Sequence, residues 1–426
     1  MVNNKITILH FNTNPSGGAY KAAERLHEAF LEEDFNSYIV TKYPNRQKIR
    51  NSISYRESIE PMLLERIGNK LRYRPKNIAQ QYYALWFNEK KSKLPKKELR
   101  YYASFKPDII ILNWVTAYLA AGDIQKLQNL TGAKIFWNLL DKGPLTSICH
   151  YTWDCQQYTS VCRKCPISKN KKFQRIVKTT HEYRQSYYNK TNLNIIAPTS
   201  ELYKQAKASS NFKNKNINYV PLSINTKVFK SLSKDKSKKE LGISPNKKVI
   251  FFGVSRHSEV RKGIVYLNKA LKILKERIGI KSIVLLIAGH DSDQNIYAEI
   301  GYEVKSMGAI NSDEILNLCY NAADIFVSPS IEDSGPMMIN ESICCQTPIV
   351  AFNIGVANDF IKNRVNGSIV PLYNCNRMAE EINYHLFHNN CVKRFYQSEE
   401  GEKLIKMLSP FSQTEKIISI YNAEKE

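Results

Sequence analysis

The stretch DIIIL at residues 108–112 decides the fold class, because its four consecutive apolar side chains leave no polar face. A strand with one face in water alternates apolar and polar side chains, whereas a strand that is covered on both faces does not. The stretch therefore predicts a strand of a parallel sheet with helices on both sides. Similar short apolar runs alternate with longer amphipathic stretches along the whole chain, which is typical of repeated strand–helix units.

The pattern predicts about six strands in each half of the chain. They cover residues 6–11, 37–41, 108–112, 134–139, 194–197 and 218–221 in the first half, and residues 248–253, 283–288, 302–305, 325–327, 348–352 and 368–371 in the second.

A length of 426 residues favours two domains rather than one. We expect a Rossmann-like N-terminal domain over residues 1–221 and a second Rossmann-like domain over residues 222–395. Residues 396–426 should be helical, with the last helix packing back on the first domain. Ligands of open α/β sheets bind beyond the carboxyl ends of the strands, so two such domains face to face would suit a transfer between two substrates.

The charge of the chain is strongly positive, with a formal net charge of +23. Residues 42–106 contain 17 lysines and arginines against 5 acidic residues, with aromatic residues between them. Such a segment suits nucleic acid, anionic lipid headgroups or a phosphorylated substrate, but a solvated surface explains it equally well. We see neither a signal peptide nor an apolar run long enough to span a bilayer, so we expect a cytoplasmic protein with reduced cysteines.

A pair of glycines, Gly17 and Gly18, follows the first predicted strand and precedes a predicted helix. Glycine lets backbone amides approach a ligand closely, and the start of a helix favours an anion. The spacing matches neither the GxGxxG fingerprint nor the Walker A loop. Alone, the pair is as typical of a tight strand-to-helix turn as of a binding loop.

The first strand of the second predicted domain runs into the loop GVSRHSEVRKG, residues 253–263. Arg256 and Lys262 are six residues apart in this loop. Two cations placed there could clamp the two phosphates of a nucleotide diphosphate and stabilise the charge of a departing diphosphate. For Arg261, an ordinary surface position is the better interpretation.

A second loop in this domain, SIEDSGPMMINE at residues 330–341, carries Asp333 and Glu341 with seven residues between them. Gly335 and Pro336 mark a turn and the start of a helix between the two acids. A carboxylate on the loop can meet sugar hydroxyls, and one two turns into the helix can bind both hydroxyls of a ribose. Glu341 lies among apolar residues, and a buried carboxylate needs a partner.

These motifs resemble the donor domain of retaining glycosyltransferase family 4, which has the GT-B fold: two Rossmann-like α/β domains that face each other across a cleft. The resemblance rests on Arg256 with Lys262, on the two spaced acids, on QTPIVAF at residues 346–352 and on the turn at Gly367. It is densest over residues 194–371 and thinnest over residues 42–106.

The resemblance implies a role for each residue. Arg256 and Lys262 would bind the donor diphosphate, Glu341 the ribose and Asp333 the donor sugar. The donor-binding positions that it implies are Gly17, Gly18, Arg256, Lys262, Asp333, Ser334, Gly335, Pro336, Met337 and Glu341. The family usually has Glu where this chain has Asp333, so the sugar would either lie closer or be held more weakly.

The loop DKGPLTSICHY at residues 141–151 resembles a subgroup of the same family from exopolysaccharide and O-antigen pathways. That subgroup reads roughly HDxWPxTGGCHY, whereas this chain has Leu140 in place of the His and Gly143 in place of the Trp. Asp141 corresponds to the Asp of that signature and is the candidate catalytic residue on the acceptor side. A role that depends on the His does not carry over to this chain.

Four cysteines lie in and after this loop: Cys149, Cys155, Cys162 and Cys165. Two of them form a C-x-x-C pair, and four thiolates can hold a structural zinc ion in a tetrahedral site. Their spacing is irregular for a zinc ribbon, so free thiols and disulfides remain alternatives.

The resemblance thus implies an enzyme of the hexosyltransferase type that moves a sugar from a UDP- or GDP-sugar, with retained anomeric configuration and no catalytic metal. The acceptor would be a bacterial glycan, a lipid-linked oligosaccharide of surface polysaccharide or lipopolysaccharide synthesis. The basic segment would hold the protein on the anionic inner face of the cell membrane. A nucleotide-sugar epimerase of the same architecture is the alternative. A nucleic-acid-binding protein is less favoured, because it would leave the glycine and acid motifs unexplained.

Overall fold

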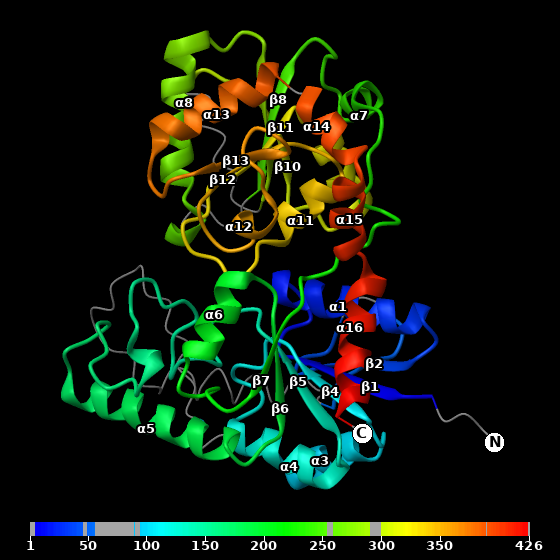
Figure 1. The fold of residues 1–426 in the computed structure, drawn as a ribbon, viewed down its shortest axis with the longest axis vertical. Coiled ribbons are helices and arrows are strands. Elements are labelled where there is room, and N and C mark those ends of the chain that lie inside the picture. Colours follow the sequence, from blue (N-terminus) through cyan, green and yellow to red (C-terminus); the bar gives the residue numbers. More distant parts are fainter. Residues whose placement is uncertain are drawn as a thin grey trace. The chain divides into compact units, whose positions relative to one another are not determined.

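The computed structural model describes residues 5–45, 49–55, 89, 94–253, 259–289, 300–388 and 390–424. The chain divides into two compact units (Figure 1). The first unit comprises Met1–Val220 together with Thr414–Glu426, and the second comprises Pro221–Gln413.

The first unit is built on a parallel sheet of seven strands in the order β3-β2-β1-β4-β5-β6-β7. Its strands are β1 (Thr7–Asn12), β2 (Asn36–Thr41), β3 (Ser52–Ile53), β4 (Ile109–Leu112), β5 (Lys134–Asn138), β6 (Leu193–Ala197) and β7 (Asn216–Tyr219). Its helices are α1 (Gly18–Glu32), α3 (Lys96–Ala103), α4 (Ala121–Thr131), α5 (Lys171–Tyr188), α6 (Ser200–Ala208) and α16 (Pro410–Ala423), with a 3-10 turn at Gln157–Thr159.

The strand β4 shows why the sheet is covered on both faces. Ile110 and Leu112 lie in one apolar cluster, whereas Ile109 and Ile111 lie in a second cluster on the opposite face. The second cluster includes side chains of α1 and of α16. The uninterrupted apolar run at residues 109–112 therefore reflects burial of alternate side chains against different helices.

The second unit repeats the same sheet topology with six parallel strands in the order β10-β9-β8-β11-β12-β13. These are β8 (Lys248–Gly253), β9 (Ile283–Ala288), β10 (Glu303–Gly308), β11 (Ile325–Ser328), β12 (Ile349–Phe352) and β13 (Gly367–Val370). The helices are α7 (Lys234–Glu240), α8 (Ile264–Ile278), α10 (Asp313–Ala322), α11 (Met337–Cys344), α12 (Ala357–Phe360), α13 (Cys375–Phe387), α14 (Asn390–Tyr396) and α15 (Glu399–Met407), with the 3-10 turn η2 at Val260–Lys262 before α8.

Each sheet has one point where the strand order reverses. In the first unit it lies between β1 and β4, and in the second it lies between β8 and β11. The connections that leave two such strands diverge to opposite sides, so ligands of doubly wound sheets bind beyond the carboxyl ends of the strands at this point. The loops after β1, β4, β8 and β11 are therefore where functional residues are expected.

Most of the basic segment at residues 42–106 lies outside the described residues, because residues 46–48, 56–88 and 90–93 are not described. The structure consequently leaves the predicted membrane-binding role of this segment untested. Within the described ranges, none of the helices combines the length and the apolar character that a bilayer crossing requires.

A buried pair of histidines, His10 of β1 and His27 of α1, should make the first unit sensitive to acid. His10 is fully buried, and neither of its ring nitrogens has a hydrogen-bond partner in the described part of the chain. The ring of His27 lies 5.7 Å from it, between centroids. Burial holds the pKa of His10 well below its usual value and lowers the pKa of His27 to about 4. Both rings are therefore neutral in the folded protein at moderately acidic pH.

We expect the free energy of unfolding to fall as the pH drops from about 6.5 towards 4. Above the unfolded pKa of about 6.5 both states hold the rings neutral, whereas below it only the unfolded chain takes up protons. The loss should reach roughly 2 kcal/mol per histidine at pH 5. Urea unfolding at pH 7.5 and pH 5 measures it. Because burial also lowers the pKa values of His181 and His385 to about 4, His10→Leu should remove about a quarter of the histidine contribution to the difference. An identical pH dependence in the variant would contradict this account.

Candidate functional site

The loops after β8 and β11 meet at the reversal point of the second sheet. The backbone N–H of Ile331 donates to the carbonyl oxygen of Arg261 at 2.8 Å, which joins the loop after β11 to η2. Gly263 ends η2 with φ +66°, and a Cβ at this position would lie 1.8 Å from the carbonyl oxygen of Pro329. Only glycine permits this approach, so the sequence places Arg261 and Lys262 directly beside the loop that carries Asp333.

Asp333, Arg261 and Lys262 form a compact group that we call the Asp333 cluster. Oδ2 of Asp333 accepts hydrogen bonds from Nζ of Lys262 at 2.7 Å and from Nη1 of Arg261 at 2.9 Å. Oδ1 accepts from the backbone N–H groups of Ser334 at 2.9 Å and Gly335 at 3.3 Å. Burial alone would raise the pKa of Asp333, but Lys262, Arg261 and the hydrogen bonds hold it well below its usual value. The carboxylate is therefore ionised, and the loop is fixed around it.

The position of Arg261 differs from the surface position that its sequence context favoured. Its side chain is 14% exposed, and Nε also donates to Glu259 Oε1 at 2.6 Å. No local pattern marks this residue, because its partner Asp333 is 72 residues away in the chain. Arg256 falls in residues 254–258, outside the described residues, so its predicted role stays a prediction.

Glu341 occupies the second turn of α11 and is 3% exposed. The hydroxyl of Tyr320 donates to its Oε2 at 2.8 Å. Tyr320 is fully buried and packs edge-on against Phe251, with ring centroids 5.0 Å apart. The expectation that this buried carboxylate has a partner is confirmed, and the partner is a tyrosine held rigidly by the core.

The remaining predicted donor positions form the connection between Asp333 and α11. Ser334 is 3% exposed, and its Oγ has no hydrogen-bond partner in the part of the chain that the structure describes. Gly335 and Pro336 bring the chain to Met337, the first residue of α11. Met337 is partly buried beside the main apolar cluster of this unit. All of these residues lie at the carboxyl end of β11, where a ligand is expected.

The first unit carries its own group of polar residues at the reversal point of its sheet. The backbone of Trp114, two residues beyond β4, donates to Oδ1 of Asn12 at 3.0 Å and accepts from the N–H of Thr13 at 2.8 Å. Gly17 precedes α1 with φ +89°, which requires glycine. A Cβ at Gly18 would have no described atom within 4 Å, so packing does not explain the second glycine.

Asp141 lies in the same region, after β5, and is nearly completely buried. Its Oδ2 accepts from Nε1 of Trp114 at 2.8 Å and contacts Nδ1 of His150 at 2.5 Å. Its Oδ1 accepts from the backbone N–H of Gly143 at 2.9 Å. A carboxylate that holds one ring nitrogen of a histidine fixes the tautomer and orientation of that ring. The sequence did not predict this pairing with His150, although the residue is part of the CHY signature of the loop.

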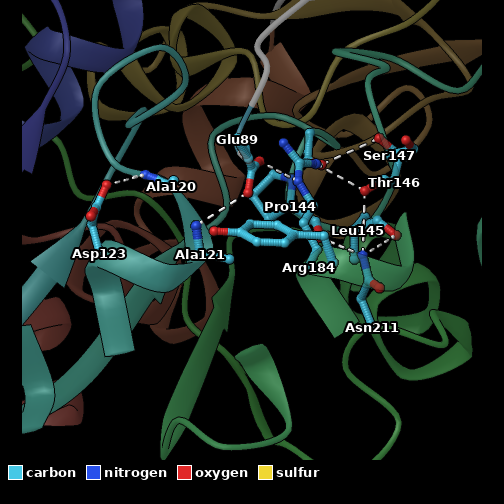
Figure 2. Close-up of polar contacts among 12 residues, drawn as sticks. Glu89, Ala120, Ala121, Asp123, Pro144, Leu145, Thr146, Ser147, Arg184 and Asn211 are labelled. Atoms are coloured by element: carbon cyan, nitrogen blue, oxygen red, sulfur yellow. Dashed lines mark hydrogen bonds and ion pairs between the residues drawn. The ribbon is translucent and has the colours of Figure 1, made fainter. Parts of the chain in front are cut away.

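Arg184 of α5 donates hydrogen bonds to the backbone of this loop (Figure 2). Its Nη1 donates to the carbonyl oxygens of Gly143 at 2.6 Å and Thr146 at 2.9 Å, and its Nε pairs with Glu89 at 2.5 Å. Asn211 donates to carbonyl oxygens of the same loop. The loop that bears Asp141 is thus fixed by buried polar contacts and not merely by its own turns.

The four cysteines of the first unit are all free thiols. Burial raises the pKa of Cys149, and the neighbouring Cys165, Cys162 and Cys155 raise it further. Among the described residues, no group of three or more His, Cys, Asp or Glu is arranged as a metal site. The zinc site stays a prediction from the sequence.

Comparison with known proteins gives a family match within the second unit. Residues 233–402 match the model of a family described as glycosyl transferases group 1. An uncharacterized glycosyltransferase of Methanocaldococcus jannaschii is 28% identical over 184 residues, which cover 40% of this chain and 45% of that protein. The chain thus spans less than half the length of this curated relative.

Solved structures match almost the whole chain. Sucrose-phosphate synthase from Thermosynechococcus elongatus has a TM-score of 0.68 at 15% identity and covers 98% of this chain and 99% of its own. HepE from Anabaena, in complex with UDP-glucose, has a TM-score of 0.62 at 14% identity and covers 98% of this chain and 100% of its own. At this identity the likeness concerns the fold. The predicted fold class is confirmed: the chain has the GT-B fold, and its residues 233–402 match the glycosyl transferases group 1 family.

Proposed function

We propose that this protein is a glycosyltransferase that takes a sugar from a nucleotide-diphosphate sugar, a UDP- or GDP-sugar, with retained anomeric configuration. One observation carries the proposal. The segment that matches the glycosyl transferases group 1 model contains the Asp333 cluster, which presents Lys262 and Arg261 where a doubly wound sheet binds its ligand. HepE, a protein of the same fold, is described in complex with UDP-glucose, which supports a ligand of this class.

The donor would bind through charge and hydroxyl contacts. Lys262, with Arg256, would hold the diphosphate and stabilise the charge that develops on it as the sugar leaves. A divalent metal would then not be needed for the chemistry. Glu341, oriented by Tyr320, would bind the ribose hydroxyls. Gly18, with open space where a side chain would lie, would let the backbone at the start of α1 approach the substrates.

The acceptor would bind to the first unit. Asp141 and His150 form a fixed pair of polar groups at the carboxyl end of that sheet. From the resemblance, we propose that the acceptor is a bacterial glycan, lipid-linked and destined for surface polysaccharide. The basic segment at residues 42–106 would then hold the protein on an anionic membrane surface.

The activity can be tested without knowing the acceptor. The full chain is incubated with UDP-glucose, UDP-N-acetylglucosamine and GDP-mannose, each with and without a panel of reducing-end-tagged oligosaccharides, and products are resolved by mass spectrometry and NMR. Transfer to an oligosaccharide with retained configuration is expected for one donor. Conversion of a nucleotide sugar to its epimer without any acceptor would instead show an epimerase.

Asp141→Asn should lower the turnover of this reaction about tenfold, which is the effect expected from the loss of one charge-assisted hydrogen bond. The amide keeps the size of the side chain but removes the charge that orients His150. We expect little change in the affinity for UDP, because donor and acceptor are assigned to different units. Steady-state kinetics and UDP titration measure the two effects. Unchanged turnover, or an equal loss of UDP affinity, would remove Asp141 from the acceptor side.

A further inference from the structure

The acceptor capacity of the Asp333 carboxylate is already used within the protein. A carboxylate has two oxygens with about four lone-pair sites. In this structure four donors occupy them: Lys262 and Arg261 on Oδ2, and the N–H groups of Ser334 and Gly335 on Oδ1. The side chain is only 9% exposed. A sugar hydroxyl could bond Asp333 only by displacing one of these four donors.

Lys262, in contrast, has more N–H donors than its contact with Asp333 uses. An ammonium group has three N–H donors and a guanidinium has five. A bond to Asp333 therefore leaves Lys262 able to bind phosphate oxygens as well. Lys262 is 20% exposed at its side chain, more than either Asp333 or Arg261, so it is the member of the cluster that solvent, and hence a ligand, reaches best.

The backbone keeps the cluster in one arrangement. The contact of Gly263 with Pro329 and the Ile331–Arg261 hydrogen bond fix η2 against the loop after β11. The two N–H groups on Oδ1 fix the carboxylate on that loop. Asp333 thus has a set position relative to the chain, and the long side chains of Lys262 and Arg261 take their positions from it.

We propose that Asp333 is a positioning residue: it holds Lys262 and Arg261 for the donor diphosphate and does not bind the donor sugar. This inference rests on the proposed function and deepens it, since it adds Arg261 to the phosphate site. It also explains how an aspartate can stand where the resembling family usually has the longer glutamate. The shorter side chain is the one that meets the two cations, and the sugar must be recognised by other groups.

The two roles predict different effects of Asp333→Asn on two probes, UDP and UDP-glucose, each titrated calorimetrically into the full chain. The amide of Asn has one acceptor oxygen and one NH2 group, so it cannot accept from the cations and from the two backbone N–H groups at once, and it carries no charge that would hold the cations. If Asp333 positions the cations, both dissociation constants rise together by about tenfold. If it binds the sugar, UDP-glucose loses at least tenfold more affinity than UDP. That second result overturns the proposal, as do unchanged or tighter dissociation constants for both probes.

Further variants keep the test decisive. Arg261→Ala should weaken both probes by a common factor even if Asp333→Asn fails to fold, and a loss confined to UDP-glucose would count against the proposal. Asp333→Glu restores the charge and should recover most of the UDP affinity; binding as weak as in Asp333→Asn would contradict it. Asp235→Asn, at an exposed position on α7, is the matched control and should leave both constants unchanged. If the unaltered protein binds neither UDP, GDP nor their sugars, the proposed function itself fails, independently of Asp333.

Discussion

Lys262→Ala should reduce the affinity for the donor nucleotide sugar about a hundredfold, the largest effect that we expect from a single substitution. Its ammonium supplies charge-assisted hydrogen bonds to the diphosphate, and a loss of about 3 kcal/mol corresponds to this factor. The fold should survive, because Asp333 keeps Arg261 and two backbone N–H groups as partners. Calorimetric titration with the preferred nucleotide sugar measures the affinity, and thermal unfolding checks the fold.

The control for this substitution is Lys272→Ala. Lys272 is an exposed lysine of α8 in the same unit, so its removal changes the net charge equally. We expect its donor affinity to stay within about twofold of that of the unaltered protein, as for a surface charge. Equal losses in the two variants would mean that Lys262 acts only through the overall charge of the protein.

Glu341→Gln should weaken the binding of UDP about thirtyfold, because a charged acceptor for two ribose hydroxyls becomes a neutral one. Glutamine has the size of glutamate, and its amide oxygen can still accept the hydrogen bond from Tyr320. The unfolding temperature should therefore change little. A comparison of UDP with 2′-deoxy-UDP isolates the contact: the unaltered protein should prefer UDP, and the variant should not.

Glu276→Gln is the matched control for Glu341, since Glu276 is exposed on α8. It should leave the preference for UDP over 2′-deoxy-UDP intact. If Glu341→Gln also retains the full preference, Glu341 does not bind the ribose, and its burial against Tyr320 would be a matter of stability alone.

The sheets could be predicted because their side chains are buried on both faces. The predicted strands agree with twelve observed ones, although β7 was placed two residues too late, at 218–221 instead of Asn216–Tyr219. Val220 and Pro221 are apolar and buried, but proline has no N–H for a sheet ladder and ends the pairing. The edge strand β3 was missed, because two residues, Ser52 and Ile53, carry no periodic pattern.

The candidate site was predictable only where one loop contains the evidence. The spacing of Asp333 and Glu341 and the position of Lys262 after a strand are local features. Two contacts depend on how separate segments meet in the fold, and no local sequence pattern encodes them. They are the contact of Arg261 with Asp333 and that of His150 with Asp141. The sequence likewise cannot show that the carboxylate of Asp333 accepts four hydrogen bonds, because two of the four donors are backbone N–H groups.

The most direct test of the central claim is a calorimetric titration of the full chain with UDP-glucose, UDP-N-acetylglucosamine and GDP-mannose. The proposed function predicts that at least one of them binds at a single site per chain, in competition with the free nucleoside diphosphate, and that Lys262→Ala weakens this binding about a hundredfold. If none of these nucleotide sugars binds, or if binding persists undiminished in Lys262→Ala, the second unit does not hold the donor in the way proposed.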